Sequence, residues 1–229
     1  MTARKNNPHG SLDTIPTSWY EVGMSGVQHQ SKTRLLDATL TLVRTKGYAA
    51  TTIDDVCNRA ELTKGSFFHH FSGKEELAVE AAKHWSAVTG SLFALAPYTR
   101  LADPMERVLG YVDFRKAIIQ GEVPQFTCFV GTMVQEVHQT SPAIRAACNA
   151  SIREHAARVE ADIALAMQRR GIKADFTARS LALYTQAVLQ GAFILAKAEN
   201  GRETAKECID HLRRYIQMLF RQPEQEGVN

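Results

Sequence analysis

A cluster of hydroxyl, amino and imidazole side chains lies within residues 51–77, TTIDDVCNRAELTKGSFFHHFSGKEEL. Side chains of these types donate hydrogen bonds to phosphate oxygens and to base edges. The donors are Thr52, Thr63, Lys64, Ser66, His69, His70 and Lys74. The sequence contains no nucleophile elbow, phosphate loop, metal-ligand spacing or paired carboxylates on one helix face. The residue types therefore favour recognition of a nucleic acid over catalysis.

Two short helices joined by a turn must position these donors. Thr52 can cap the first helix, with Asp55 completing a box three residues later, and Thr63 can cap the second. The side chains expected to pack inward are Ile53, Val56, Cys57, Ala60, Phe67, Phe68 and Phe71. Helices this short need a surface on which to dock, and the helix predicted over 33–46 supplies it. The pattern predicts a helix-turn-helix, whose second helix enters the DNA major groove.

Residues 33–77 resemble the DNA-binding domain of the tetracycline-repressor (TetR) family of bacterial transcriptional regulators. The resemblance rests on the helix TRLLDATLTLVRTKG and on Gly47-Tyr48, Thr51-Thr52-Ile53, Val56, Ala60, Leu62, Lys64-Gly65-Ser66, His70-Phe71 and Lys74-Glu75-Glu76-Leu77. Glu61 departs from it, because the family more often has glycine in this turn. Phe68 also departs, because the usual tyrosine would offer a hydroxyl donor near the DNA backbone.

The resemblance implies a double-stranded DNA operator as the partner. Contacts with bases or their flanking phosphates are expected from Lys64, Gly65, Ser66, Phe67 and His69. Contacts with the phosphate backbone, which fix register without reading sequence, are expected from Thr52, Thr63, His70 and Lys74.

The charge distribution supports this assignment. The chain has 229 residues and a formal net charge of +3, and all of that excess falls within residues 31–74. Three charges are a small excess, so they count as support only beside the motif. No apolar run approaches a membrane span, and the polar start lacks a secretory segment, which predicts a cytoplasmic protein with no membrane contact. The four cysteines are scattered, which predicts reduced thiols with no metal and no cofactor.

The rest of the chain is predicted to be helical as well. Together with the DNA-binding segment it gives an all-α fold of nine helices, with no strand. The helices beyond the motif are predicted over 74–94, 104–119, 126–138, 142–170, 176–199 (capped by Asp175) and 203–220. The predicted organisation is a flexible tail over 1–30, a helix-turn-helix domain over 31–76, an effector-binding and dimerisation domain over 77–221, and a disordered tail over 222–229. Met24 is an alternative start.

The resemblance implies that the last two helices form a homodimer and that the preceding helices bind a small-molecule effector. Helix 176–199 is apolar on more than one face, which supports dimerisation and makes Leu189 a candidate contact; packing within a monomer is the alternative. The candidate effector contacts are Trp85, Phe93, Tyr111, Phe114, Phe126, Cys128, Phe129, Met133 and His138. Core packing is the alternative for each.

Cys128 has its own hypothesis. It follows an interrupted loop and opens a helix, a position that lowers a thiol pKa. Its segment also loosely resembles the family branch that senses electrophiles through a cysteine. A buried, inert thiol is the alternative.

The sequence thus predicts a homodimeric, ligand-responsive transcriptional repressor that a small molecule releases from its operator. A transcriptional activator would share every residue argument. An all-α enzyme or ligand carrier is the alternative from another class, and a salt-dependent shift of duplex DNA would distinguish it.

Overall fold

The computed structural model describes residues 30–221, and within that range it contains ten α-helices, one 3₁₀ turn and no strand. The predicted tails, apart from Gln30, lie outside the described residues. The helices are α1 (Gln30–Lys46), α2 (Ile53–Ala60), α3 (Lys64–His70), α4 (Lys74–Leu95), α5 (Pro104–Ala117), α6 (Val123–Phe126), α7 (Phe129–Val137), α8 (Pro142–Arg169), α9 (Ala178–Glu199) and α10 (Glu203–Leu219), with the 3₁₀ turn η2 at Pro97–Arg100. The all-α prediction is confirmed, and the count of nine is corrected to ten.

The additional helix is α6, one short turn that the sequence prediction treated as a loop. Glu122 begins it, and the Gln125 side chain returns to accept from the Glu122 backbone N–H at 2.6 Å. Thr127 and Cys128 then adopt extended backbone, so α7 starts at Phe129 rather than at residue 126.

The start of α9 also differs from its prediction. Thr177, not Asp175, caps this helix, since the Thr177 hydroxyl accepts from the Ser180 backbone N–H at 3.0 Å. The helix ends at Glu199, as predicted, and the left-handed backbone of Asn200 (φ 50°) closes its last turn.

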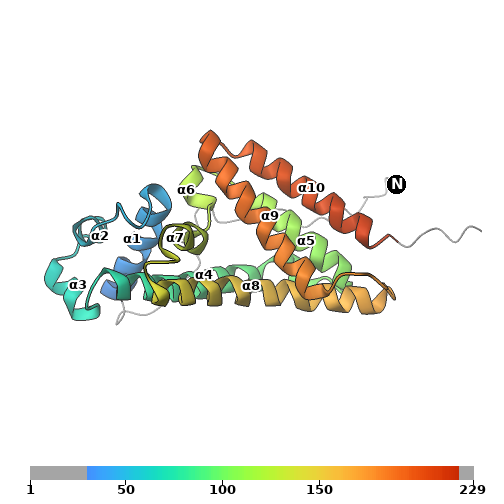
Figure 1. Cartoon of the computed structure of the whole chain (residues 1–229), viewed down its shortest axis with the longest axis horizontal. Helices are drawn as coiled ribbons and strands as arrows, with labels where there is room; N and C mark the ends of the chain where they lie inside the picture. Colours follow the sequence, from blue (N-terminus) through green and yellow to red (C-terminus); the bar gives the residue numbers. More distant parts are fainter. Residues whose placement is uncertain (1–29, 222–229) are drawn as a thin grey trace, which may run out of the picture.

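The helices form an elongated molecule with α1, α2 and α3 at one end (Figure 1). The two long helices α4 and α8 pack along its length. At the far half α5 and α9 pack on α8, and α10 packs on the outside of α5 and α9. The short helices α6 and α7 lie between the two ends, where both contact α1.

Two hydrophobic cores result, and the first does not end with the DNA-binding segment. It joins α1, α2 and α3 to the first half of α4, but also to α7 and the start of α8. Phe129 and Met133 of α7 are fully buried in it. Because this core is closely packed, a movement of α7 would displace side chains that support the helix-turn-helix.

α9 is long and apolar enough, by length and composition, to cross a membrane. Its apolar side chains are divided between the second core and an outward face. Packing in the second core accounts for the buried part of this composition.

Candidate DNA interface and effector cavity

Both predicted caps of the helix-turn-helix are present. The Thr52 hydroxyl accepts from the Asp55 backbone N–H at 3.1 Å, and the Asp55 carboxylate accepts from the Thr52 N–H at 2.8 Å. The Thr63 hydroxyl accepts from the Ser66 N–H at 3.1 Å and begins α3. Hydrogen bonding to Lys46, together with the Thr52 bonds, holds the Asp55 pKa well below its usual range, so the box stays closed near neutral pH.

The turn between α2 and α3 has left-handed backbone at Glu61, with φ 53° and ψ 46°. A side chain crowds its own backbone in this conformation, whereas glycine adopts it freely. This backbone conformation is the physical reason why glycine is more common than glutamate at this position of the turn. Its carboxylate pairs with Arg34 at 3.1 Å, but an ion pair this exposed contributes little compensation.

Two predictions for the aromatic residues of α3 are wrong. Phe68, expected to pack inward, is 56% exposed. Phe67 is fully buried, which confirms its predicted inward packing and contradicts its predicted DNA contact. The cause is helical spacing: Phe67 and Phe71 lie four residues apart on one face, with ring centroids 5.6 Å apart, and Phe68 is turned about 100° away. Phe67 therefore anchors α3, and Phe68 lies on its outer surface.

The outward surface of α3 consists of its cap, its first turn and two aromatic side chains. The exposed residues are Thr63, Lys64, Gly65, Phe68 and His69. Ser66 and His70 are half-buried, and His70 Nε2 lies 2.6 Å from the Ser31 hydroxyl of α1. His70 thus already ties α3 to α1 in the free protein.

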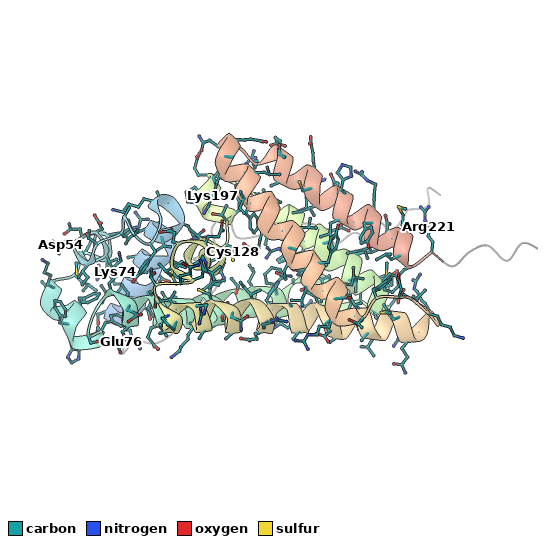
Figure 2. The ribbon with its side chains drawn as sticks, in the orientation of Figure 1. Asp54, Lys74, Glu76, Cys128, Lys197 and Arg221 are labelled. Atoms are coloured by element: carbon teal, nitrogen blue, oxygen red, sulfur yellow. The ribbon has the colours of Figure 1, made fainter. Side chains whose placement is uncertain are left out.

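The Lys64 ammonium is engaged within the protein. It lies 2.8 Å from the Asp54 carboxylate of α2, at the far end of the molecule (Figure 2). Hydrogen bonding to Asp54 raises the Lys64 pKa, so the lysine is fully charged at neutral pH. Contact with a phosphate would exchange one anionic partner for another.

The loop joining α1 to α2 is held from two sides. Lys74 Nζ lies 4.2 Å from the centroid of the Tyr48 ring and donates to the Ala49 carbonyl at 3.3 Å; burial lowers the Lys74 pKa. From α7, the Glu136 carboxylate accepts from the Tyr48 N–H at 3.0 Å and the Ala49 N–H at 2.9 Å. Lys74 of α4 and Glu136 of α7 therefore hold the approach to α2 in place.

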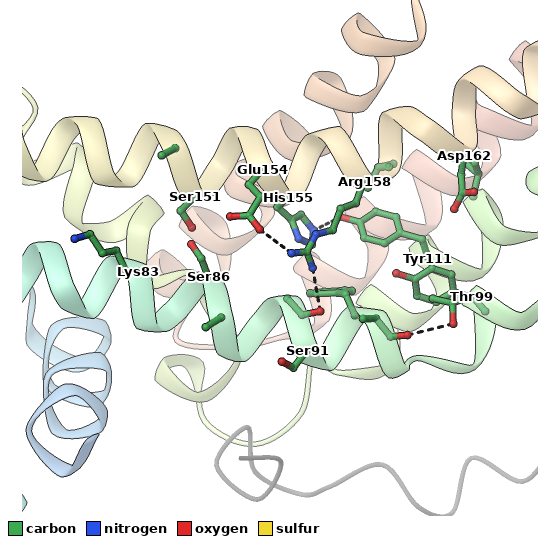
Figure 3. Close-up of a pocket in the computed structure, with 18 of the residues that line it drawn as sticks. Lys83, Ser86, Ser91, Thr99, Tyr111, Ser151, Glu154, His155, Arg158 and Asp162 are labelled. Carbon is green, nitrogen blue, oxygen red and sulfur yellow. Dashed lines mark hydrogen bonds and ion pairs between the residues drawn. The ribbon is translucent and has the colours of Figure 1, made fainter. Parts of the chain in front are cut away.

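The effector domain contains an open groove and a small inner cavity. The groove, about 810 Å³, lies mainly between α4 and α8, where Arg158 reaches from α8 to the Gly90 carbonyl of α4 at 3.0 Å (Figure 3). The inner cavity, about 40 Å³, lies deeper. Phe93, Ser151 and His155 line both spaces.

The predicted effector residues divide between these spaces and the core. The inner cavity is lined by Trp85, Phe93, Phe126 and Cys128, and the groove by Phe93 and Tyr111. Phe114 packs edge-on against Phe93, with centroids 5.6 Å apart, and lines neither.

Three of the predicted effector residues lie elsewhere. Phe129 and Met133 fill the first core, and His138 is exposed after the last turn of α7. The α7 face that carries Phe129 and Met133 is turned toward α1 and α4 instead.

Sequence reasoning missed most of the polar lining. The missed residues include Arg115, Ser151, His155, Arg158, Gln186 and Gln190. Gln186 and Gln190 stand four residues apart in the long apolar helix α9, and that spacing was the signal that could have found them.

A buried hydrogen-bond chain closes one side of the cavity. The Gln186 amide donates to the Tyr111 hydroxyl at 3.1 Å, and the same hydroxyl lies 3.0 Å from His155 Nε2. Burial, with smaller effects of Arg115 and Arg158, lowers the His155 pKa to about 3, so the imidazole is neutral under physiological conditions.

Cys128 stands at the start of α7, as predicted. Its Sγ accepts from the Gly131 backbone N–H at 3.4 Å, and the side chain is partly exposed. Lys197 of α9, whose pKa is lowered by burial, donates to the Thr132 hydroxyl in the same turn at 2.6 Å (Figure 2). By contrast, Cys57 and Cys148 are buried, as expected for Cys57, and burial raises the Cys148 pKa to about 12.

The outer surface of α9 and α10 carries large apolar side chains. The exposed ones are Tyr184, Ile194, Leu195, Tyr215 and Met218, and Ala187 and Gly191 lie on the same side of α9. We call these seven residues the outer face. Leu189 is fully buried in the protomer, so its prediction as a dimer contact is wrong.

Two family models match this chain, one in its N-terminal part and one in its C-terminal part. The family model for bacterial regulatory proteins of the tetR family matches residues 35–81, and the model for the tetracyclin repressor-like C-terminal domain matches residues 104–212. Together they cover more than half of the chain.

Individual relatives are more distant. The regulator BetI of Paraburkholderia phymatum is 23% identical over 202 residues, covering 86% of this chain and 96% of BetI. The repressor DhaR of Mycobacterium sp. strain GP1 is 22% identical over 158 residues, covering 69% of this chain and 78% of DhaR. Several other matches are short: they cover 46–57 residues, which is 20–25% of the relative's length.

Solved structures share the fold. The reduced form of Escherichia coli NemR superposes with a TM-score of 0.71 at 19% identity, covering 81% of this chain and 96% of NemR. A helix-turn-helix with both caps formed, an all-helical effector domain behind it and two family models over most of the length converge on one conclusion. The chain belongs to the TetR family of DNA-binding transcriptional regulators.

Proposed function

We propose that this chain is a dimeric repressor that a small molecule releases from its operator. The observation that carries the proposal is that Trp85, which lines the inner cavity, also packs in the core that supports the helix-turn-helix. DhaR, similar over two thirds of this chain, is named a transcriptional repressor, which supports repression over activation. Residues 31–76 would form the DNA-binding unit and residues 77–221 the effector unit.

DNA contacts are assigned to the surface that α3 presents. Lys64, Gly65 and His69 would face the major groove, with the exposed Phe68 beside them in place of Phe67. Thr63 would contact phosphate at the start of α3. Since Ser66 and His70 are half-buried and Thr52 already bonds to Asp55, contributions from these three would be backbone contacts. Lys74, at the start of α4, would add a positive charge that attracts the phosphate backbone.

Dimerisation is assigned to the outer face. Monomeric proteins seldom leave so many large apolar side chains together on one surface. Ala187 and Gly191 leave room for a second helix, since a Cβ built on Gly191 meets nothing within 4 Å. Two copies joined here would present two α3 helices to two half-sites, as a dimeric helix-turn-helix protein requires.

Two contacts connect the cavity to the DNA-binding domain. Trp85 lines the cavity, and its ring lies 5.2 Å from the guanidinium of Arg44, a buried residue of α1. Arg44 also donates to the Gln125 carbonyl of α6 at 3.2 Å. A ligand that displaced Trp85 or α6 would therefore move α1, and with it α2 and α3.

The proposal is tested by selecting bound sequences from random duplex DNA and measuring operator affinity by fluorescence anisotropy. We expect a two-fold symmetric site, a steep decrease of affinity with salt, and a 2:1 protein-to-duplex ratio in sedimentation. A monomer on a single half-site would overturn the dimer, and equal affinity for all sequences would overturn the operator.

A further inference from the structure

Arg115 of α5 is a cation inside the effector domain that has no anionic partner among the described residues. Within residues 30–221, its Nε is the one buried side-chain nitrogen that has no hydrogen-bond acceptor. The other basic residues of α5 are paired: Arg107 with Asp162 and Lys116 with Asp210, each at 2.7 Å. Of the three basic residues of α5, the unpaired one is thus the residue that lines the cavity.

Two aromatic rings hold the Arg115 guanidinium in place but do not neutralise its charge. Its carbon lies 5.2 Å from the centroid of the Phe93 ring and 5.5 Å from that of Phe193. Such contacts stabilise a cation partly, but aromatic rings offer no acceptor in the plane of the N–H groups. The donors of Arg115 are held in place and left available.

Two titratable groups that face Arg115, Tyr111 and His155, are neutral near pH 7. Burial raises the Tyr111 pKa and lowers that of His155 to about 3, so neither supplies a negative charge near pH 7. Arg158, the other nearby cation, already pairs with Glu154 at 2.7 Å. Because arginine does not deprotonate in proteins, the cavity carries an unbalanced positive charge.

The size of the cavity limits the group that could balance this charge. A volume of about 40 Å³ holds roughly three water-sized atoms, which matches the three heavy atoms of a carboxylate. Four aromatic rings line the same space: Trp85, Phe93, Phe126 and Phe193. The groove of about 810 Å³ begins on the other side of Phe93 and His155, so rotation of these side chains would admit a larger body.

We propose that the effector is an aryl carboxylate, with its carboxylate on Arg115 and its ring among the aromatic side chains toward the groove. This inference rests on the proposed function for the role of the ligand, but not for its binding. Arg115 would act through the bidentate geometry in which guanidinium groups hold carboxylates. One cation and a mostly apolar lining favour a monoanion over phosphate.

The test is calorimetric titration of the full chain with three aryl carboxylates: benzoate, phenylacetate and 1-naphthoate. Benzamide serves as the neutral match of benzoate, and inorganic phosphate as the anion without a ring. We expect at least one carboxylate to bind, with benzamide and phosphate at least tenfold weaker. Arg115→Gln should weaken carboxylate binding roughly tenfold or more and leave benzamide unchanged, whereas Arg115→Lys should keep part of the affinity.

Lys116→Gln is the matched control, because it removes a charge from the next position of α5 on the side facing Asp210. It should bind carboxylates like the parent. Circular dichroism checks that each variant folds; if Arg115→Gln does not, the benzoate-to-benzamide ratio of the parent and of Arg115→Lys decides. Equal binding of benzoate and benzamide, an unchanged Arg115→Gln, or no binding of any of the three carboxylates overturns the inference.

The outcomes separate the ligand site from the proposed function. Carboxylate binding that depends on Arg115 but leaves operator affinity unchanged supports the site and overturns induced release. Failure of the ligand-free protein to bind any selected duplex overturns the repressor while leaving the site supported.

Discussion

Glu136 offers the most direct test of how the effector domain holds the DNA-binding domain. Its two carboxylate oxygens accept the Tyr48 and Ala49 backbone N–H groups at 3.0 and 2.9 Å, across the junction between α7 and the α1–α2 loop. Glu136→Ala removes both acceptors and leaves the packing of the α7 face toward the first core unchanged. The loop then keeps its contacts with Lys74 and its own turn hydrogen bonds, such as that from the Thr51 hydroxyl to the Gly47 carbonyl at 2.7 Å.

The expected loss follows from the two bonds. Hydrogen bonds to a charged acceptor contribute about 1.5–3 kcal/mol each when buried, but this carboxylate is exposed and water can replace it. We expect the free energy of unfolding to fall by about 1–2 kcal/mol in total, which lowers the melting temperature by roughly 2–8 °C. If the loss is local, the Tyr48 and Ala49 amides should exchange with solvent roughly 5- to 30-fold faster.

Amide exchange followed by NMR measures the two N–H groups directly, and thermal unfolding measures the total. Glu136→Gln keeps one acceptor oxygen and should fall between the parent and Glu136→Ala. Glu106→Gln changes the charge equally at an exposed site of α5 and should alter neither quantity. Unchanged exchange at both amides in Glu136→Ala would refute the reasoning, because the carboxylate would then not be holding the loop.

Four further predictions concern other surfaces. Asp54→Asn releases Lys64 from its ion pair and removes a negative charge beside the proposed DNA surface, so operator affinity should rise about three- to tenfold. Fluorescence anisotropy measures this affinity, and weaker binding would show that Asp54 orients Lys64. Ile194→Glu, on the outer face, should yield monomers in sedimentation, while Leu165→Glu, exposed on α8, should remain dimeric; dimers in both would place the interface elsewhere. The His155 pKa is lowered from 6.5 to about 3, so below about pH 6.5 the unfolded state takes up a proton that the folded state does not, and stability is lost as the pH falls toward 3. Between pH 7 and pH 5 this linkage costs about 2 kcal/mol, which denaturant titration should find missing in His155→Gln; equal acid sensitivity of parent and variant would contradict it. Limited alkylation followed by mass spectrometry should label Cys128 ahead of the other three cysteines and release DNA, and an unlabelled Cys128 would make it a packing residue.

Much of the fold could be predicted from the sequence, because its signals are local. Capping boxes, the proline that starts α5 and the residues that stop helices depend on neighbours within four positions, which the sequence displays directly. The errors at α6 and at the start of α9 concern one turn or two residues. At helix ends several caps compete, and the packing of the following segment selects among them.

The effector cavity could be predicted only in part. Apolar periodicity identifies the buried face of a helix, but not whether that face meets another helix or an empty space. Phe93 and Phe129 therefore look alike in the sequence, while the first lines the cavity and the second fills the core beneath the DNA-binding domain. Arg115 was overlooked because an arginine without a partner can be recognised only when every neighbour is in place.

The sequence by itself determined the helix-turn-helix, the all-helical class and the family, since caps, helical periodicity and motif spacing are properties of contiguous residues. The tertiary structure alone decided that Phe67 turns inward and Phe68 outward, that Leu189 belongs to the protomer, and that Glu136 reaches the α1–α2 loop. Each of these depends on which elements meet across dozens of residues. The choice between burial and exposure is settled by that packing and not by the residue type.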